Sequence, residues 1–176
     1  MGDFVACFPV TMQQEGWHQF SNNPKDPGGK TYNGVTQNTW DIWCHREGLP
    51  ASDVRKMTDA QCMALYRAQY WGAVHGDDLP KGIDLCVWDE GVNAGPVQAI
   101  KLLQQALGLK VDGHFGLTTA NALRGVNDVH SLIQKYNTLR LSWYHRLKTW
   151  TVFRKGWTAR VQAITNKALK MAGGSL

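Results

Sequence analysis

Apolar residues recur at helical spacing along most of the chain. The first such stretch puts four residues on one predicted helical face: Val5, Phe8, Met12 and Glu15. Asp3 precedes this helix as a candidate N-cap, and Gly16 follows as its expected end. Pro9 either kinks the helix or lies in its first turn. The pattern therefore predicts a short N-terminal helix with Glu15 in its last turn, on the apolar side.

Periodicity and end signals predict seven further helices. They span about 39–47, 58–70, 83–92, 96–108, 118–123, 129–147 and 157–171. A capping box at Thr58 and Gln61 opens the second of these, and Pro96 opens the fourth. Residues 21–36, dense in Asn, Pro and Gly, predict a turn-rich loop or a small β-wing. Since no β-alternation occurs outside 28–36, the expected fold class is all-α or nearly so.

Composition narrows the class of protein. With 176 residues, 43% apolar and 19% charged, the chain suits one domain or one domain with a small appendage. No apolar run approaches the roughly 20 residues that span a bilayer. The N-terminal segment MGDFVACFPV lacks the basic region and cleavage site of a signal peptide, so synthesis in the cytosol is expected. The four cysteines form no CxxC pair, which predicts reduced, part-buried thiols rather than a zinc site.

The formal charge is unevenly distributed. Residues 1–128 contain ten Lys or Arg and fourteen Asp or Glu, a net charge of −4, whereas residues 129–176 contain nine Lys or Arg and no acid, +9. A purely basic terminal segment suggests an anionic partner such as nucleic acid, a lipid surface or a cell-wall polymer. The alternative is a solvated helix face that keeps the protein soluble.

Carboxylates are the more informative chemical groups, because no GxSxG, HExxH, P-loop or dinucleotide motif is present. A carboxyl held in an apolar cleft has a raised pKa and can serve as the general acid of a glycosidase, which makes Glu15 a candidate. The alternative for Glu15 is a solvent-facing residue at a helix C-terminus. Asp26, in the polar loop, could hold a water molecule or form a turn.

Two other sets of residues could serve either to stabilise the fold or to bind a ligand. Asp89 and Asn93 share one face of an apolar helix, where polar groups either brace buried structure or line a cleft. Tyr66, Tyr70 and Trp71 form an aromatic cluster that either stacks on sugars or belongs to the core.

In order along the chain, several motifs together resemble glycoside hydrolase family 108, the N-acetylmuramidases of phage endolysins and related bacterial proteins. They are Glu15-Gly16, Asp26-Pro27-Gly28-Gly29-Lys30-Thr31, Gly34-Val35-Thr36, Leu65-Tyr66-Arg67, Tyr70-Trp71, Trp88-Asp89 and Asn93-Ala94-Gly95-Pro96. Residues 102–123 and 148–158 resemble the peptidoglycan-binding region of the same family. The motifs of that region are Leu103-Gln104, Leu107-Gly108, Val111-Asp112-Gly113, Phe115-Gly116, Thr118, Lys148-Thr149-Trp150 and Gly156-Trp157-Thr158.

The resemblance implies a helical lysozyme-like fold with a muramidase region at 1–98 and a peptidoglycan-binding helical region at 99–176, packed as one unit. It implies hydrolysis of the β-1,4 bond between N-acetylmuramic acid and N-acetylglucosamine, with Glu15 in the position of the catalytic Glu. No metal or organic cofactor is expected. Asp26, Thr31 and Thr36 are alternatives for holding the attacking water.

The chain departs from the family pattern at three places. Trp17 replaces the second Gly of the Glu-Gly-Gly motif, and Tyr32-Asn33 alters the usual order before Gly34. The third departure is Pro9. Substrate contacts are therefore expected from residues near Glu15 and from the cleft-forming helices. The expected set is Trp17, Tyr32, Asn33, Tyr70, Asp89 and Asn93.

The resulting hypothesis is a monomeric endolysin, made without a signal peptide in the host cytoplasm and reaching the periplasmic cell wall through holin-type release. Its expected partners are peptidoglycan strands and an anionic envelope surface that meets the basic segment. A non-catalytic peptidoglycan-binding module and a secreted antibacterial muramidase are the alternatives. A nucleic-acid partner is not expected, because no groove-reading motif is visible.

Overall fold

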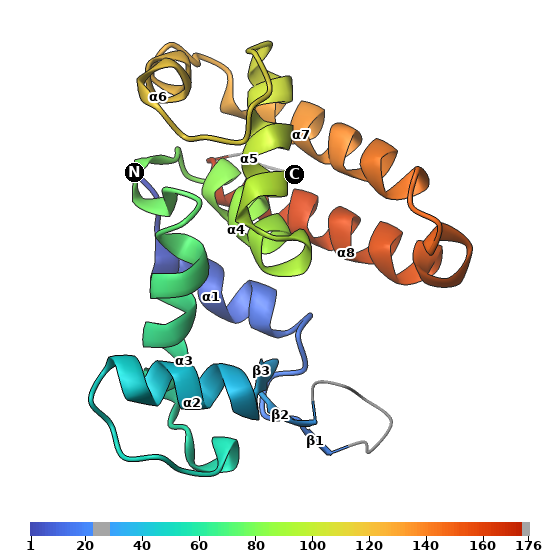
Figure 1. The fold of residues 1–176 in the computed structure, drawn as a ribbon. Coiled ribbons are helices and arrows are strands. Elements are labelled where there is room, and N and C mark those ends of the chain that lie inside the picture. The colour runs from blue at the N-terminus through green and yellow to red at the C-terminus, as the bar shows by residue number, and fades with distance from the viewer. Residues whose placement is uncertain (23–28, 174–176) are drawn as a thin grey trace. The chain divides into compact units, whose positions relative to one another are not determined.

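The computed structural model describes residues 1–22 and 29–173, which fall into two compact units. One comprises residues 8–68, and the other combines residues 1–7 with residues 69–176. Figure 1 shows the α-helices and the small sheet that make up the described residues. The expected mainly α, lysozyme-like class is confirmed.

The unit of residues 8–68 holds the sheet and the sequence-predicted catalytic residue. Its elements are the end of α1 (Phe4–Met12), β1 (Phe20–Asn22), β2 (Lys30–Tyr32), β3 (Val35–Thr36), α2 (Gln37–Arg46), the 3-10 turn Val54–Lys56 and α3 (Asp59–Tyr66). The strands are antiparallel in the order β1-β2-β3, which confirms the β-wing. The Thr36 hydroxyl caps α2, and the capping box between Thr58 and Gln61 is present at the start of α3.

The other unit is a bundle around a buried helix. It contains the end of a π-helical turn (Arg67–Trp71), a 3-10 turn (Gly76–Asp78), α4 (Ile83–Ala94), α5 (Pro96–Leu107), α6 (Leu117–Arg124), α7 (Val129–His145) and α8 (Trp150–Met171). Every residue of α4 from Ile83 to Gly91 is buried, as its apolar sequence predicts. This burial follows because α5, α7 and α8 all pack against α4.

The first helix is shorter than the sequence predicted. It ends at Met12, and the chain then turns through residues 13–18, so Glu15 lies beyond the helix. Val5 is 68% exposed, whereas Phe4, Cys7 and Phe8 are buried, so the buried face is rotated from the one expected. Pro9 lies inside the helix and cannot donate a backbone hydrogen bond there.

The compact units do not follow the sequence division at residue 98. Helix α4 precedes that position but packs with α5, α7 and α8 in the second unit. The division into a muramidase region and a peptidoglycan-binding region thus stays a prediction about function. All four cysteines are buried free thiols, in agreement with the sequence. Within the described ranges, no helix is both long and apolar enough to cross a membrane.

Candidate active site

Glu15 occupies the tight turn that follows α1. Its backbone N–H donates to the Met12 carbonyl oxygen at 3.1 Å, and the N–H of Trp17 donates to the same oxygen at 3.1 Å. Gly16 between them has a φ of +76°, which favours glycine. The Glu15 side chain is half-buried, and its Oε1 atom has essentially no exposed surface. The turn thus presents a carboxyl group that is partly sheltered from water.

The hairpin between β2 and β3 closes against Glu15. Its two turn residues, Asn33 and Gly34, have φ values of +53° and +74°, as a type I′ turn requires. A Cβ added at Gly34 would lie 3.7 Å from the Glu15 Cβ atom and 2.7 Å from the Tyr66 hydroxyl. Glycine at this position therefore lets the hairpin approach both residues closely.

Asn33 ties this hairpin to the turn that carries Glu15. Its Oδ1 accepts from the His18 N–H at 2.6 Å, and its own N–H donates to the Gln19 carbonyl at 3.2 Å. The Tyr66 hydroxyl donates to the Asn33 carbonyl at 3.1 Å. Asn33 has no exposed surface, so it holds the turn and does not reach a ligand in this conformation. Its expected substrate contact gains no support.

Trp17 is half-buried beside Glu15. Its ring packs edge-on against Phe8, with 5.3 Å between ring centroids, and stacks on His18 at 4.7 Å. The His18 Nε2 atom in turn lies 3.1 Å from an Asp59 carboxylate oxygen at the start of α3. Trp17 therefore contributes to packing while part of its ring stays accessible.

The two threonines expected to hold water lie opposite each other, because Thr31 pairs with Thr36 across β2 and β3. The Thr31 hydroxyl donates to the Gly29 carbonyl at 3.4 Å, a long contact. The Thr36 hydroxyl accepts from the Thr39 N–H at 3.2 Å as a helix cap. Tyr32 on β2 is half-buried. Asp26 lies outside the described residues.

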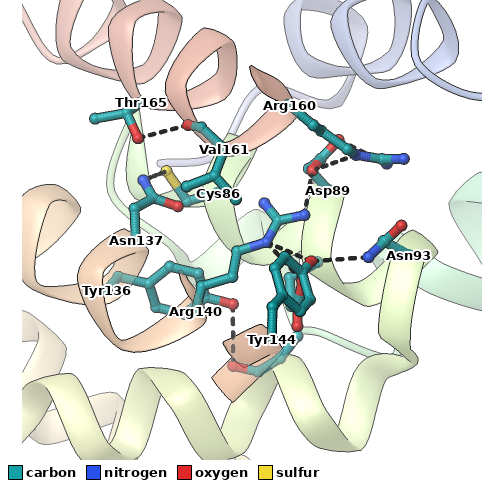
Figure 2. A network of polar contacts seen from close by, with 12 residues as sticks. Cys86, Asp89, Asn93, Tyr136, Asn137, Arg140, Tyr144, Arg160, Val161 and Thr165 are labelled. Carbon is teal, nitrogen blue, oxygen red and sulfur yellow. Dashed lines mark hydrogen bonds and ion pairs between the residues drawn. The ribbon is translucent and has the colours of Figure 1, made fainter. Parts of the chain in front are cut away.

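The remaining sequence-predicted residues, Tyr70, Asp89 and Asn93, belong to the other unit. Tyr70 is half-buried and packs edge-on to Trp88. Asp89 is fully buried between Arg140 of α7 and Arg160 of α8 (Figure 2), with N···O distances of 2.7 and 2.9 Å. Asp89 thus braces three helices, and its expected substrate contact gains no support.

Glu90 and Tyr144 extend this network. The Tyr144 hydroxyl donates to Glu90 and accepts from Asn93 Nδ2 at 2.7 Å. Arg140 Nε lies 2.6 Å from Glu90 Oε2. Asn93 is half-buried and remains at the edge of the network in Figure 2.

The two buried carboxyl groups of this network differ in pKa. Burial would raise the pKa of Asp89, but Arg140 and Arg160 outweigh it, so the pKa is lowered. Burial raises the pKa of Glu90, and Arg140 only partly opposes this. Sequence reasoning missed Arg140 and Arg160 because their partners lie 51 and 71 residues away. The available signal was a charged residue on the apolar stripe of α7.

The three glutamates of the chain differ in their exposure to solvent. Glu90 has no exposed surface, and Glu47 is exposed and paired with Arg46 at 3.0 Å. Glu15 alone combines a sheltered carboxyl oxygen with a part-exposed side chain. No group of His, Cys, Asp and Glu within the described ranges is arranged to hold a metal ion.

A second structured feature lies in the region whose sequence resembles a peptidoglycan-binding module. The buried Gln104 side chain accepts from the N–H groups of Asp112 and Gly113 at 3.0 and 2.9 Å. The Nε2 atom of the same side chain donates to the Asp112 carboxylate and to the His114 carbonyl. One glutamine therefore fixes the loop between α5 and α6, in which Val111 is exposed, as is Leu117 at the start of α6.

Comparison with known proteins identifies both regions. A model of the family described as glycosyl hydrolase 108 matches residues 8–95, and a model described as a predicted peptidoglycan domain matches residues 98–162. No curated protein matches the chain. The solved structure of SagA from Brucella abortus is similar at 36% sequence identity and a TM-score of 0.80, with 98% of this chain and 97% of that chain covered.

The family match covers the half of the chain that carries Glu15 and the hairpin beside it, and the similarity to SagA extends over nearly all of both chains. The chain therefore belongs to the glycosyl hydrolase 108 family and is a glycoside hydrolase that acts on peptidoglycan.

Proposed function

We propose that the enzyme hydrolyses the β-1,4 bond between N-acetylmuramic acid and N-acetylglucosamine, with Glu15 as the general acid. The observation that carries this proposal is the placement of the three glutamates, of which only Glu15 is both sheltered and accessible. A protonated carboxyl held against the glycosidic oxygen can deliver its proton as the bond breaks through an oxocarbenium-like state.

The second half of the reaction requires a positioned water. Thr31 and Thr36 face each other on the hairpin that abuts Glu15, and Asp26 precedes the same hairpin in sequence. We propose that one of these three residues positions the attacking water. Thr36 already caps α2, so Thr31 and Asp26 are the stronger candidates. Trp17 and Tyr32, both half-buried, are the proposed sugar contacts of this unit; Tyr70 and Asn93 are the proposed contacts of the other.

The test is the pair Glu15→Gln and Glu47→Gln, the same substitution at the sheltered and at the exposed glutamate. Loss of general-acid help costs about 10²–10⁴ in rate, so Glu15→Gln should lose lysis of purified cell walls by at least that factor. Glu47→Gln should retain lysis. Equal, substantial lysis by both folded variants would remove Glu15 from the mechanism.

The cellular role is a further part of the proposal and is supported by the family resemblance. We propose a monomeric endolysin, made in the cytoplasm, which reaches the wall after a holin-type protein opens the membrane. Expression of the enzyme alone should leave a bacterial culture intact, and co-expression with a holin should lyse it. Lysis by the enzyme alone would contradict the requirement for a release partner.

A further inference from the structure

The turn between α7 and α8, with the first turns of α8, forms an exposed surface that we call the α7–α8 tip (residues 146–155). Figure 1 shows this turn at the end of the α7–α8 hairpin, where the ribbon passes from orange to red. Two adjacent apolar residues of the tip face solvent, Val152 at 74% and Phe153 at 50% exposure. Exposed apolar groups side by side at a protruding end are unfavourable in water and mark a contact surface.

Basic residues lie on both sides of these apolar groups in the sequence. Four exposed cations lie within the ten residues of the tip: Arg146, Lys148, Arg154 and Lys155. None of the four forms an ion pair or side-chain hydrogen bond in the described part of the chain. Helix α8 has no acidic residue in its first turn, and its N-terminus adds further positive potential. The tip therefore presents uncompensated positive charge around an apolar centre.

The tryptophans at this end of the hairpin stack on other rings, which reduces the ring face open to a sugar. Phe153 is the exposed ring of the tip, and it packs at a tilt against Trp157 with 5.4 Å between ring centroids. Trp150 stacks on His145 at 3.8 Å and faces Trp157 at 6.3 Å between centroids. Trp157 also stacks on Tyr144 at 4.9 Å. The most exposed apolar group, Val152, is aliphatic and offers no stacking face. These contacts favour a lipid partner over a glycan.

A shallow hollow with a mostly apolar lining lies beside the apolar centre. It has a volume of about 480 Å³ and is lined by Trp150, Arg154, Lys155, Thr158, Ala159 and Gln162. Two cations, a hydroxyl and an amide line one depression, and these are groups that bind phosphate oxygens. Tryptophan at its edge matches the preference of that residue for the level of lipid headgroups.

We propose that the α7–α8 tip docks on the surface of a bilayer that contains anionic phospholipid. Val152 and Phe153 enter the boundary between headgroups and acyl chains, while the four cations contact the headgroups. The hydrolase would then be held at the membrane face of the cell wall. This inference concerns attachment alone and does not depend on Glu15 or on which glycosidic bond is cut.

The test measures sedimentation of the full chain with vesicles of phosphatidylcholine, with and without a quarter of phosphatidylglycerol. Two variants probe the tip, Val152→Ser/Phe153→Ser and Arg154→Gln/Lys155→Gln. The matched control is Lys167→Gln/Lys170→Gln, which removes the same charge about 20 Å further along α8. A thermal melt of each variant checks that the fold is kept.

The wild type should bind the anionic vesicles, and high salt should weaken the binding. Each tip variant should reduce the partition coefficient roughly tenfold, whereas the control should change it much less. Equal losses of vesicle binding in the tip and control variants would show that binding depends on net charge alone, and would overturn the proposal. So would failure of the wild type to bind, or tip variants that lose retention on lipid-free peptidoglycan while vesicle binding is unchanged.

Discussion

At the scale of single residues, the position of Glu15 depends on the missing side chain of Gly34 and on the hydrogen bonds of Asn33. Gly34 has no side chain, and this absence lets the hairpin lie against both Glu15 and the Tyr66 hydroxyl. Asn33 then locks the approach through hydrogen bonds to the turn and to α3. The turn that carries Glu15 is thus held by residues that need no contact with substrate.

The substitution Gly34→Ala should therefore reduce both stability and activity. A side chain at φ +74° is strained, and its Cβ would meet the Tyr66 hydroxyl at 2.7 Å. We expect a loss of about 1–3 kcal/mol in the free energy of unfolding and a fall in wall lysis measured on the folded fraction.

Gly48→Ala is the matched control for this prediction. Gly48 also has a positive φ, +65°, but open space lies around its missing Cβ. It reports the backbone cost alone and should keep full specific activity. If Gly34→Ala and Gly48→Ala behave alike in activity, the hairpin does not orient Glu15.

Residue-level prediction from the sequence worked where the chemistry is local. Glu15 could be selected because it neighbours Gly16 and an apolar helix, but its exact surroundings depend on Gly34, which is 19 residues away. Asn33 and Asp89 were expected to contact substrate, yet both are fully buried. Polarity in the sequence does not reveal whether a side chain meets solvent or another part of the fold.

At the scale of elements, one buried ion cluster joins α4, α7 and α8. The Asp89 carboxylate forms ion pairs with both Arg140 and Arg160. Glu90 forms an ion pair with Arg140 and accepts a hydrogen bond from the Tyr144 hydroxyl. Their opposite pKa shifts predict opposite roles, because only Asp89 is more stable as an anion in the folded protein than in water.

Asp89→Asn should destabilise the protein far more than Glu90→Gln. The first variant removes the carboxylate that both Arg140 and Arg160 contact, although Arg140 keeps Glu90 as a partner, and loss of one member of a buried pair costs about 3–5 kcal/mol. Gln at position 90 can still accept from Tyr144 and removes a carboxylate that burial disfavours, so we expect a change below about 1 kcal/mol. Urea unfolding followed by circular dichroism measures both. Equal costs would contradict the assignment.

The same cluster predicts an acid-sensitive contribution to stability. The pKa of Asp89 is lowered on folding, so its stabilising effect is complete above its ordinary value and is lost as the pH falls through the folded-state pKa. The difference in unfolding free energy between wild type and Asp89→Asn should therefore shrink as the pH falls below about 4. A difference that stays constant from pH 7 to pH 3 would show that Asp89 acts by packing alone.

Helix boundaries were predictable where a local end signal exists. The capping box at Thr58 and the proline at position 96 each begin a helix in the structure. The first helix was misjudged by several residues because the sequence showed no signal for its end at Met12. The ion cluster was missed entirely, since periodicity carries no information about partners in distant helices.

At the scale of the whole molecule, the sequence predicted the family and the fold class from an ordered set of motifs. The compact units were not predictable, because α4 belongs by sequence to the family model for residues 8–95 but packs with the C-terminal helices. The basic segment likewise predicted a positive charge but not where its cations lie on the fold. The structure assigns four of its cations to one tip with exposed apolar residues.

We propose that this enzyme cleaves on the reducing side of N-acetylmuramic acid by a reaction that requires Glu15. The most direct measurement is mass spectrometry of the soluble products of purified peptidoglycan after borohydride reduction. We predict that the wild type releases fragments ending in reduced N-acetylmuramic acid, and that folded Glu15→Gln releases almost none. Fragments ending in reduced N-acetylglucosamine, or the same products from Glu15→Gln at a comparable rate, would contradict this mechanism.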